Sequence, residues 1–85
     1  MTLRYSMKIT LKYYGEIAEI LDAEEETLII SSPISLTELM NQFLAKSKKL
    51  NALVIKTAVN NKLIDHNITL EDKDVISFLP PFAGG

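Results

Sequence analysis

The clearest local pattern in the sequence is a helix N-terminus at Ser35, and it constrains the fold of the rest of the chain. Ser35 and Glu38 occupy the two side-chain positions of a capping box, in which each side chain satisfies a backbone N–H at the start of the helix. The apolar residues that follow at helical spacing are Leu36, Leu39, Met40, Phe43 and Leu44. The pattern predicts an amphipathic helix that ends near Lys48 and carries Lys46, Lys48 and Lys49 in its last turn. Such a helix needs an apolar sheet to cover.

The segments on either side of this helix predict that sheet. Residues 7–14 alternate between apolar and polar side chains, as a half-buried strand does. Further strands are predicted over 27–31, 54–60, 62–65 and 74–79, with a short helix over 16–21 and an acidic loop over 22–26. We expect the first and last strands to lie side by side, because both are strongly apolar. The fold class is therefore α+β, a mixed sheet of about five strands packed on one main helix plus a short one.

The last strand has two faces with different expected roles. Ile76 and Phe78 share one face and are expected to meet Leu39 and Phe43 of the main helix. Leu79 then lies on the opposite face, next to the end of the chain. There it is a candidate apolar contact for a partner protein.

Size and composition exclude several classes of function. The 85 residues are predicted to form one domain over 1–85, with no room for an enclosed active site. The net charge of −2 argues against nucleic-acid binding, and the absence of cysteine excludes disulfides, thiolate metal sites and cysteine nucleophiles. No apolar run approaches the roughly 20 residues of a membrane span, and the first residues do not resemble a signal peptide. We expect a cytoplasmic protein with no membrane partner.

The sequence shows no residue constellation that is typical of an enzyme. His66, the single histidine, is expected in a solvated loop, and neither a phosphate-binding glycine loop nor a nucleophile-elbow motif is present. The acidic residues are expected in solvated loops or, alternatively, on an acidic docking face for a basic partner; they are Glu24, Glu25, Glu26, Glu71, Asp72 and Asp74. We therefore predict no catalytic side chains, no metal site and no bound cofactor.

The C-terminal segment 80–85 is the strongest candidate for a functional element. Pro80 and Pro81 end the last strand and stiffen the chain beyond it, and Phe82 is a candidate anchor for a partner pocket. The side chains then become smaller through Ala83, Gly84 and Gly85. The chain can therefore enter a narrow channel and present the Gly85 carboxylate inside another protein. Adenylation of that carboxylate, followed by attack of a sulfur donor, would give a thiocarboxylate, a store of sulfur that needs no cysteine.

The run from Asp74 to Gly85, with Pro80-Pro81 and then Gly84-Gly85, resembles the C-terminus of the molybdopterin synthase small subunit. The opening strand with its Tyr14-Gly15 turn and the capped helix at Ser35 extend the resemblance over roughly residues 7–85. The resemblance implies a β-grasp (ubiquitin-like) fold and a non-catalytic sulfur-donor subunit in a heterotetramer with the large subunit.

The same resemblance implies roles for the tail residues and for further partners. A ubiquitin-activating-like adenylyltransferase would use ATP on Gly85, and a sulfur donor protein would complete the thiocarboxylate. Gly85 would then donate sulfur to cyclic pyranopterin monophosphate in molybdenum cofactor biosynthesis. Gly84 would give clearance, while Phe82, Pro80 and Pro81 would position the tail.

Three alternatives remain open from the sequence. The chain could be a sister sulfur carrier for thiamine or tRNA thiolation, although such carriers usually lack the two prolines before the glycines. It could be a protein modifier that is conjugated through Gly85 to lysines of other proteins. It could also be an interaction domain without tail chemistry, for which removal of Gly84 and Gly85 would change nothing.

Overall fold

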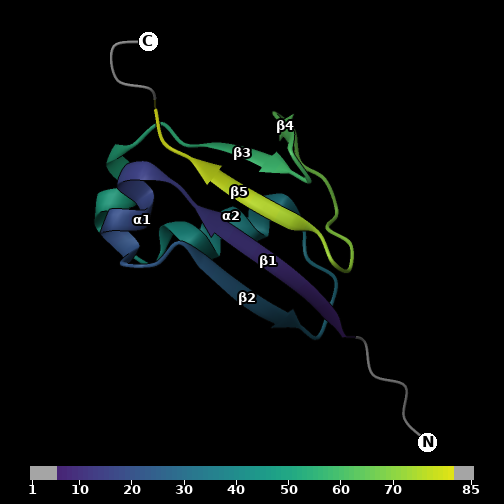
Figure 1. Ribbon diagram of the computed structural model, residues 1–85. Coiled ribbons are helices and arrows are strands. Elements are labelled where there is room, and N and C mark those ends of the chain that lie inside the picture. The colour runs from purple at the N-terminus through teal and green to yellow at the C-terminus, as the bar shows by residue number, and fades with distance from the viewer. Residues whose placement is uncertain (1–5, 82–85) are drawn as a thin grey trace, which may run out of the picture.

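The computed structural model describes residues 6–81, which form five strands, two α-helices and one 3-10 helix (Figure 1). In chain order these are β1 (Met7–Tyr13), α1 (Gly15–Leu21), β2 (Glu25–Ile30), α2 (Leu36–Leu44), η1 (Lys48–Ala52), β3 (Lys56–Val59), β4 (Lys62–Ile64) and β5 (Val75–Leu79). The helices lie on one face of the sheet, so the two-layer α+β prediction is confirmed.

The sheet has the strand order β2-β1-β5-β3-β4. β1 and β5 are parallel neighbours, with Leu11 opposite Ile76 and Tyr13 opposite Phe78, while every other pair is antiparallel. The prediction that the first and last strands lie side by side is therefore confirmed. Because the two strands are parallel, their C-terminal ends lie together, and the C-terminal segment leaves β5 next to the turn that follows β1.

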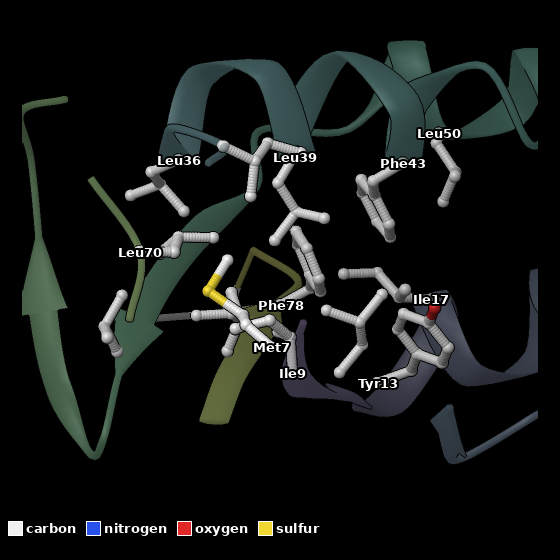
Figure 2. Packing of buried hydrophobic residues seen from close by; sticks show 14 residues of the cluster. Met7, Ile9, Tyr13, Ile17, Leu36, Leu39, Phe43, Leu50, Leu70 and Phe78 are labelled. Carbon is white, nitrogen blue, oxygen red and sulfur yellow. The ribbon is translucent and has the colours of Figure 1, made fainter. Parts of the chain in front are cut away.

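The core lies between α2 and the inner face of the sheet (Figure 2). Phe43 of α2 stacks on Phe78 of β5, with 3.9 Å between ring centroids and 6° between ring planes, and Tyr13 lies about 6 Å from both rings. Leu39 and Ile76 are buried in the same cluster, as predicted. Helix α2 begins at the predicted capping box, because the Ser35 hydroxyl accepts from the Glu38 N–H and Glu38 accepts from the Ser35 N–H.

The predicted end of the main helix near Lys48 is wrong. Helix α2 ends at Leu44, and the Lys46 N–H bonds the Phe43 carbonyl in a tighter turn. Ser47 then adopts an extended conformation and accepts a hydrogen bond from the Lys49 N–H, which starts η1. The lysines thus lie beyond α2 and do not oppose its dipole from a last turn.

The predicted acidic loop over 22–26 is also partly wrong, because β2 already begins at Glu25. The Tyr13 N–H bonds the Glu24 carbonyl, so pairing with β1 continues to this point. Glu26 accepts hydrogen bonds from the Tyr13 hydroxyl at 2.7 Å and from the Lys46 ammonium at 3.0 Å. These two partners join the half-exposed Glu26 side chain to β1 and to the segment after α2.

Asp74 also differs from the prediction of a solvated loop residue, since it is buried. Its carboxylate accepts from the Asn60 side-chain amide at 2.9 Å and from the Glu71 N–H at 2.7 Å. The Asn60 side chain in turn accepts from the Val75 N–H. The network fixes the turn at Asn60 and Asn61, whose φ values are 51° and 69°, against the start of β5.

Candidate functional site: the tail root and the outer face of the sheet

The described chain leaves the sheet at Pro80 and Pro81, which we call the tail root. Neither proline can donate to the sheet, so pairing stops at Leu79, the last residue of β5. Pro80 is half-buried and Pro81 exposed. The predicted tail residues Phe82, Ala83, Gly84 and Gly85 lie outside the described residues.

The tail root is held by Gly15, at the turn between β1 and α1. Gly15 has a φ of +54°, a conformation that residues with a Cβ rarely adopt. A Cβ at this position would stand 3.0 Å from Cγ of Pro80, closer than normal van der Waals contact. Gly15 therefore serves two purposes: it allows the turn, and it lets Pro80 pack directly on the backbone. This contact places Pro80, at the start of the tail, against the turn that follows β1.

A shallow hollow of about 610 Å³ lies beside the tail root, on the sheet face opposite the helices. Its lining is mostly apolar and consists of Tyr14, Val54, Lys56, Ala58, Asn61, Leu63, Ser77, Leu79, Pro80 and Pro81. Strand register explains its shape, because the small residue Ala58 faces both Ser77 and Leu63 across the sheet. Small side chains thus form the floor, and larger ones form the rim.

The prediction that Leu79 lies on the face opposite the helices agrees with its place in this hollow, next to Lys56 in the register. Sequence reasoning missed three further residues of the same surface. Val54 is 73% exposed, Leu63 is 63% exposed and Tyr14 is 44% exposed. Tyr14 follows β1 and reaches this surface through the pairing of β1 with β5, while Val54 and Leu63 reach it through the pairing of β3 with β5 and β4. An exposed apolar cluster of this kind is typical of a protein–protein contact.

No catalytic or metal-binding constellation accompanies this surface within residues 6–81, where no group of three or more His, Asp or Glu side chains could hold a metal. His66 lies in an exposed loop, as predicted, with Nδ1 3.1 Å from Oδ1 of Asp65. The hydrogen bond with His66 lowers the pKa of the Asp65 carboxyl. No helix in this part of the chain is long and apolar enough to cross a membrane.

Comparison with known families decides the identity. The family model of the ThiS family matches residues 11–85, which include the whole C-terminal segment. The chain belongs to the ThiS family. This ThiS-family chain thus has the ubiquitin-like β-grasp fold, and the family comprises sulfur carriers and modifiers of that fold. A comparison with curated protein sequences found no match.

Solved structures with the same fold include one named as a molybdopterin converting factor subunit and two named as small archaeal modifiers. One is provisionally named molybdopterin converting factor, subunit 1, from Pyrococcus furiosus; it is 21% identical, with a TM-score of 0.78 over 91% of this chain and 100% of that one. Another is small archaeal modifier protein 1 from Methanosarcina acetivorans, 19% identical, with a TM-score of 0.73 over 95% and 99% of the two chains. The modifier of the same name from Haloferax volcanii is 12% identical, with a TM-score of 0.75 over 92% and 99%. At these identities the likeness establishes the fold.

Proposed function

We propose that this ThiS-family chain is a sulfur carrier whose sulfur is held on the carboxyl group of Gly85. The carboxylate would attack the α-phosphorus of ATP on an activating enzyme, releasing pyrophosphate and forming an acyl-adenylate. A donor at the oxidation level of sulfide would then attack the acyl carbon, AMP would leave, and a thiocarboxylate would remain. In this proposal the chain is a substrate and then a donor, and it supplies no catalytic side chain.

The observation that carries the proposal is the construction of the tail root beside an apolar surface. Gly15 and Pro80 hold the start of the tail in one direction, and the hollow that contains Leu79 lies immediately next to it. A partner that covers the hollow would therefore receive the tail at a defined position. The family match that runs through Gly85 supports the same reading, because it includes the tail itself.

We further propose that the sulfur acceptor is cyclic pyranopterin monophosphate, bound by a molybdopterin synthase large subunit in a heterotetramer. Two observations support this acceptor. The segment Pro80-Pro81-Phe82-Ala83-Gly84-Gly85 resembles the terminus of that small subunit. The neighbour from Pyrococcus furiosus carries the name of a molybdopterin converting factor subunit. In this role Phe82 would anchor the tail and Gly84 would give it clearance in the channel.

A second candidate function is protein modification, which the two neighbours named as small archaeal modifiers favour. It would use the same adenylate, but a lysine amine of another protein would attack the acyl carbon and form an isopeptide bond. The two functions share the tail and the adenylate and differ in the group that attacks the acyl carbon, a sulfur donor in one and a lysine amine in the other.

A reconstitution with both acceptors distinguishes them. The sulfur-loaded chain is mixed with the large subunit and the cyclic pterin, and the pterin product is identified by mass spectrometry. The adenylated chain is separately mixed with a host protein extract, and conjugates are sought by immunoblot. Sulfur incorporation into the pterin, absent for a variant that lacks Gly85, is expected. Conjugates without pterin thiolation would overturn the molybdopterin assignment in favour of a modifier.

A further inference from the structure

The outer edge of strand β2 is an open edge of the sheet formed by residues 6–81. β2 is the terminal strand of the sheet and pairs on one side only, with β1 (Figure 1). The opposite terminal strand, β4, has only three residues, whereas β2 has six and contains no proline. A terminal strand of this length is a template for an added strand.

The register shows which backbone groups are unpaired. The Tyr13 N–H bonds the Glu24 carbonyl, and in an antiparallel ladder the bonded positions alternate. Glu26, Leu28 and Ile30 therefore bond β1, and the N–H and C=O groups of Glu25, Thr27 and Ile29 point to the open edge. Within residues 6–81, no backbone hydrogen bond from another element reaches this edge.

The side chains along the edge change character from one end to the other. Ile29, near the end of β2, is 69% exposed on the sheet face opposite the helices, beside Lys8 of β1. At the start of β2, Glu25 faces Lys12 of β1, and neither forms an ion pair within 4.0 Å with another of residues 6–81. Glu26 is the exception, because it is paired with Lys46.

The approach to the start of β2 is strongly acidic. Residues 16–25 contain no lysine or arginine, and the exposed carboxylates there are Glu16, Glu19, Asp22, Glu24 and Glu25. An added strand would therefore meet an apolar side chain at one end of β2 and an excess of negative charge at the other, where Lys12 is opposite Glu25 in the register. Complementary charge in the partner would set both its direction and its register.

We propose that β2 binds an extended segment of a partner protein by β-strand addition, and that this segment is apolar first and basic afterwards. The order follows from antiparallel pairing, which is the more stable arrangement per residue. Apolar residues of the segment would lie beside Ile29, and its Lys or Arg residues beside Glu25, Glu24 and Asp22. This surface is separate from the hollow at the tail root, so one chain can bind both partners at once.

The test uses the full chain and the blocked peptide acetyl-Val-Ile-Val-Thr-Val-Lys-Arg-Lys-amide, followed by nuclear magnetic resonance. Addition of the peptide is expected to shift the amide signals of Glu25, Thr27 and Ile29 and to protect these amides from exchange. The matched control peptide has Glu-Asp-Glu in place of the basic residues and is expected to bind about tenfold more weakly.

Two variants, one control variant and one modified peptide test the geometry. Thr27→Pro removes an N–H that the fold does not use, and it is expected to weaken binding by about tenfold. Glu25→Lys should weaken it by a similar factor, whereas Leu63→Thr, on the opposite edge, should leave it unchanged. A peptide N-methylated at the N–H groups that face β2 should not bind the unmodified protein, which keeps the test valid if Thr27→Pro does not fold.

Three results would overturn the proposal. The first is no shift at millimolar peptide, and the second is a set of shifts centred on Tyr14, Val54 and Leu63. The third is a dimer in sedimentation without peptide that Thr27→Pro dissociates, because the edge would then belong to a second copy of this chain.

Discussion

Substitution of Gly15 tests whether the turn after β1 holds the tail root in place. Two separate costs are expected for Gly15→Ala. The φ of +54° costs a residue with a Cβ about 1–2 kcal/mol. The new Cβ would also stand 3.0 Å from Cγ of Pro80, and relieving that overlap adds about 1 kcal/mol. The total is about 2–3 kcal/mol, a large share of the roughly 5–15 kcal/mol that stabilises a domain.

A double-mutant cycle separates the two costs. Pro80→Ala removes the atom that the new Cβ meets but leaves φ at residue 15 unchanged. The double variant should therefore be about 1 kcal/mol more stable than the sum of the single changes predicts. The assay is urea unfolding of the four proteins, analysed at constant m-value. A loss below about 0.5 kcal/mol for Gly15→Ala, or strict additivity with Pro80→Ala, would refute the account of the tail root.

Three further predictions concern the core, the hollow and the dependence on pH. Phe43→Ala removes the ring stacked on Phe78 and should lower the free energy of unfolding by about 3–5 kcal/mol in urea; a loss below about 1 kcal/mol would contradict the packing. Leu79→Asp should weaken binding to the large subunit at least tenfold in calorimetry, with little change in stability. The control variant Gln42→Asp, on the exposed side of α2, should leave this binding unchanged. Unfolding of the Leu79 variant would count against a contact role for Leu79. A hydrogen bond from Tyr13, and to a smaller extent one from Lys46, lowers the pKa of Glu26 below its ordinary value of 4.5. The ionised carboxylate therefore stabilises the fold above pH 4.5, and this contribution is lost as the pH falls through the lowered pKa. The stability difference between the unmodified protein and Glu26→Gln should therefore shrink in acid, and a difference that is constant with pH would exclude the interaction.

Local signals in the sequence predicted much of the fold. The capping box at Ser35 acts within one turn, and the alternation over 7–14 reports which face of β1 is buried, so both could be read without knowledge of the rest. The pairing of β1 with β5 followed from their shared apolar character. The expected contact between Phe43 and Phe78 followed from helical spacing combined with strand alternation.

The features that the sequence did not reveal depend on partners far away in the chain. Glu26 lies in β2 with its carboxylate bonded by Tyr13 and Lys46, and the buried Asp74 carboxylate is bonded by Asn60 and the Glu71 N–H. Helix α2 has no glycine or proline at its end, so its early stop, followed by the Ser47 cap of η1, left no strong signal.

In the candidate site too, local features could be predicted from the sequence and features that depend on distant residues could not. The direction of the Leu79 side chain could be predicted from alternation along β5, but the hollow around it could not. Val54 and Leu63 join Leu79 only through the registers of β3 with β4 and β5. The role of Gly15 was hidden as well, because the contact with Pro80 joins residues at opposite ends of the chain.

Intact-mass spectrometry after incubation with an activating enzyme, ATP and a sulfide donor tests the central claim most directly. A sulfur carrier is expected to gain the mass that corresponds to replacement of one oxygen by sulfur, and this gain should be lost in a variant without Gly85 and retained in Leu79→Asp at saturating enzyme. An unchanged mass, with an enzyme shown to be active on another carrier, would contradict the assignment of this chain as a sulfur carrier.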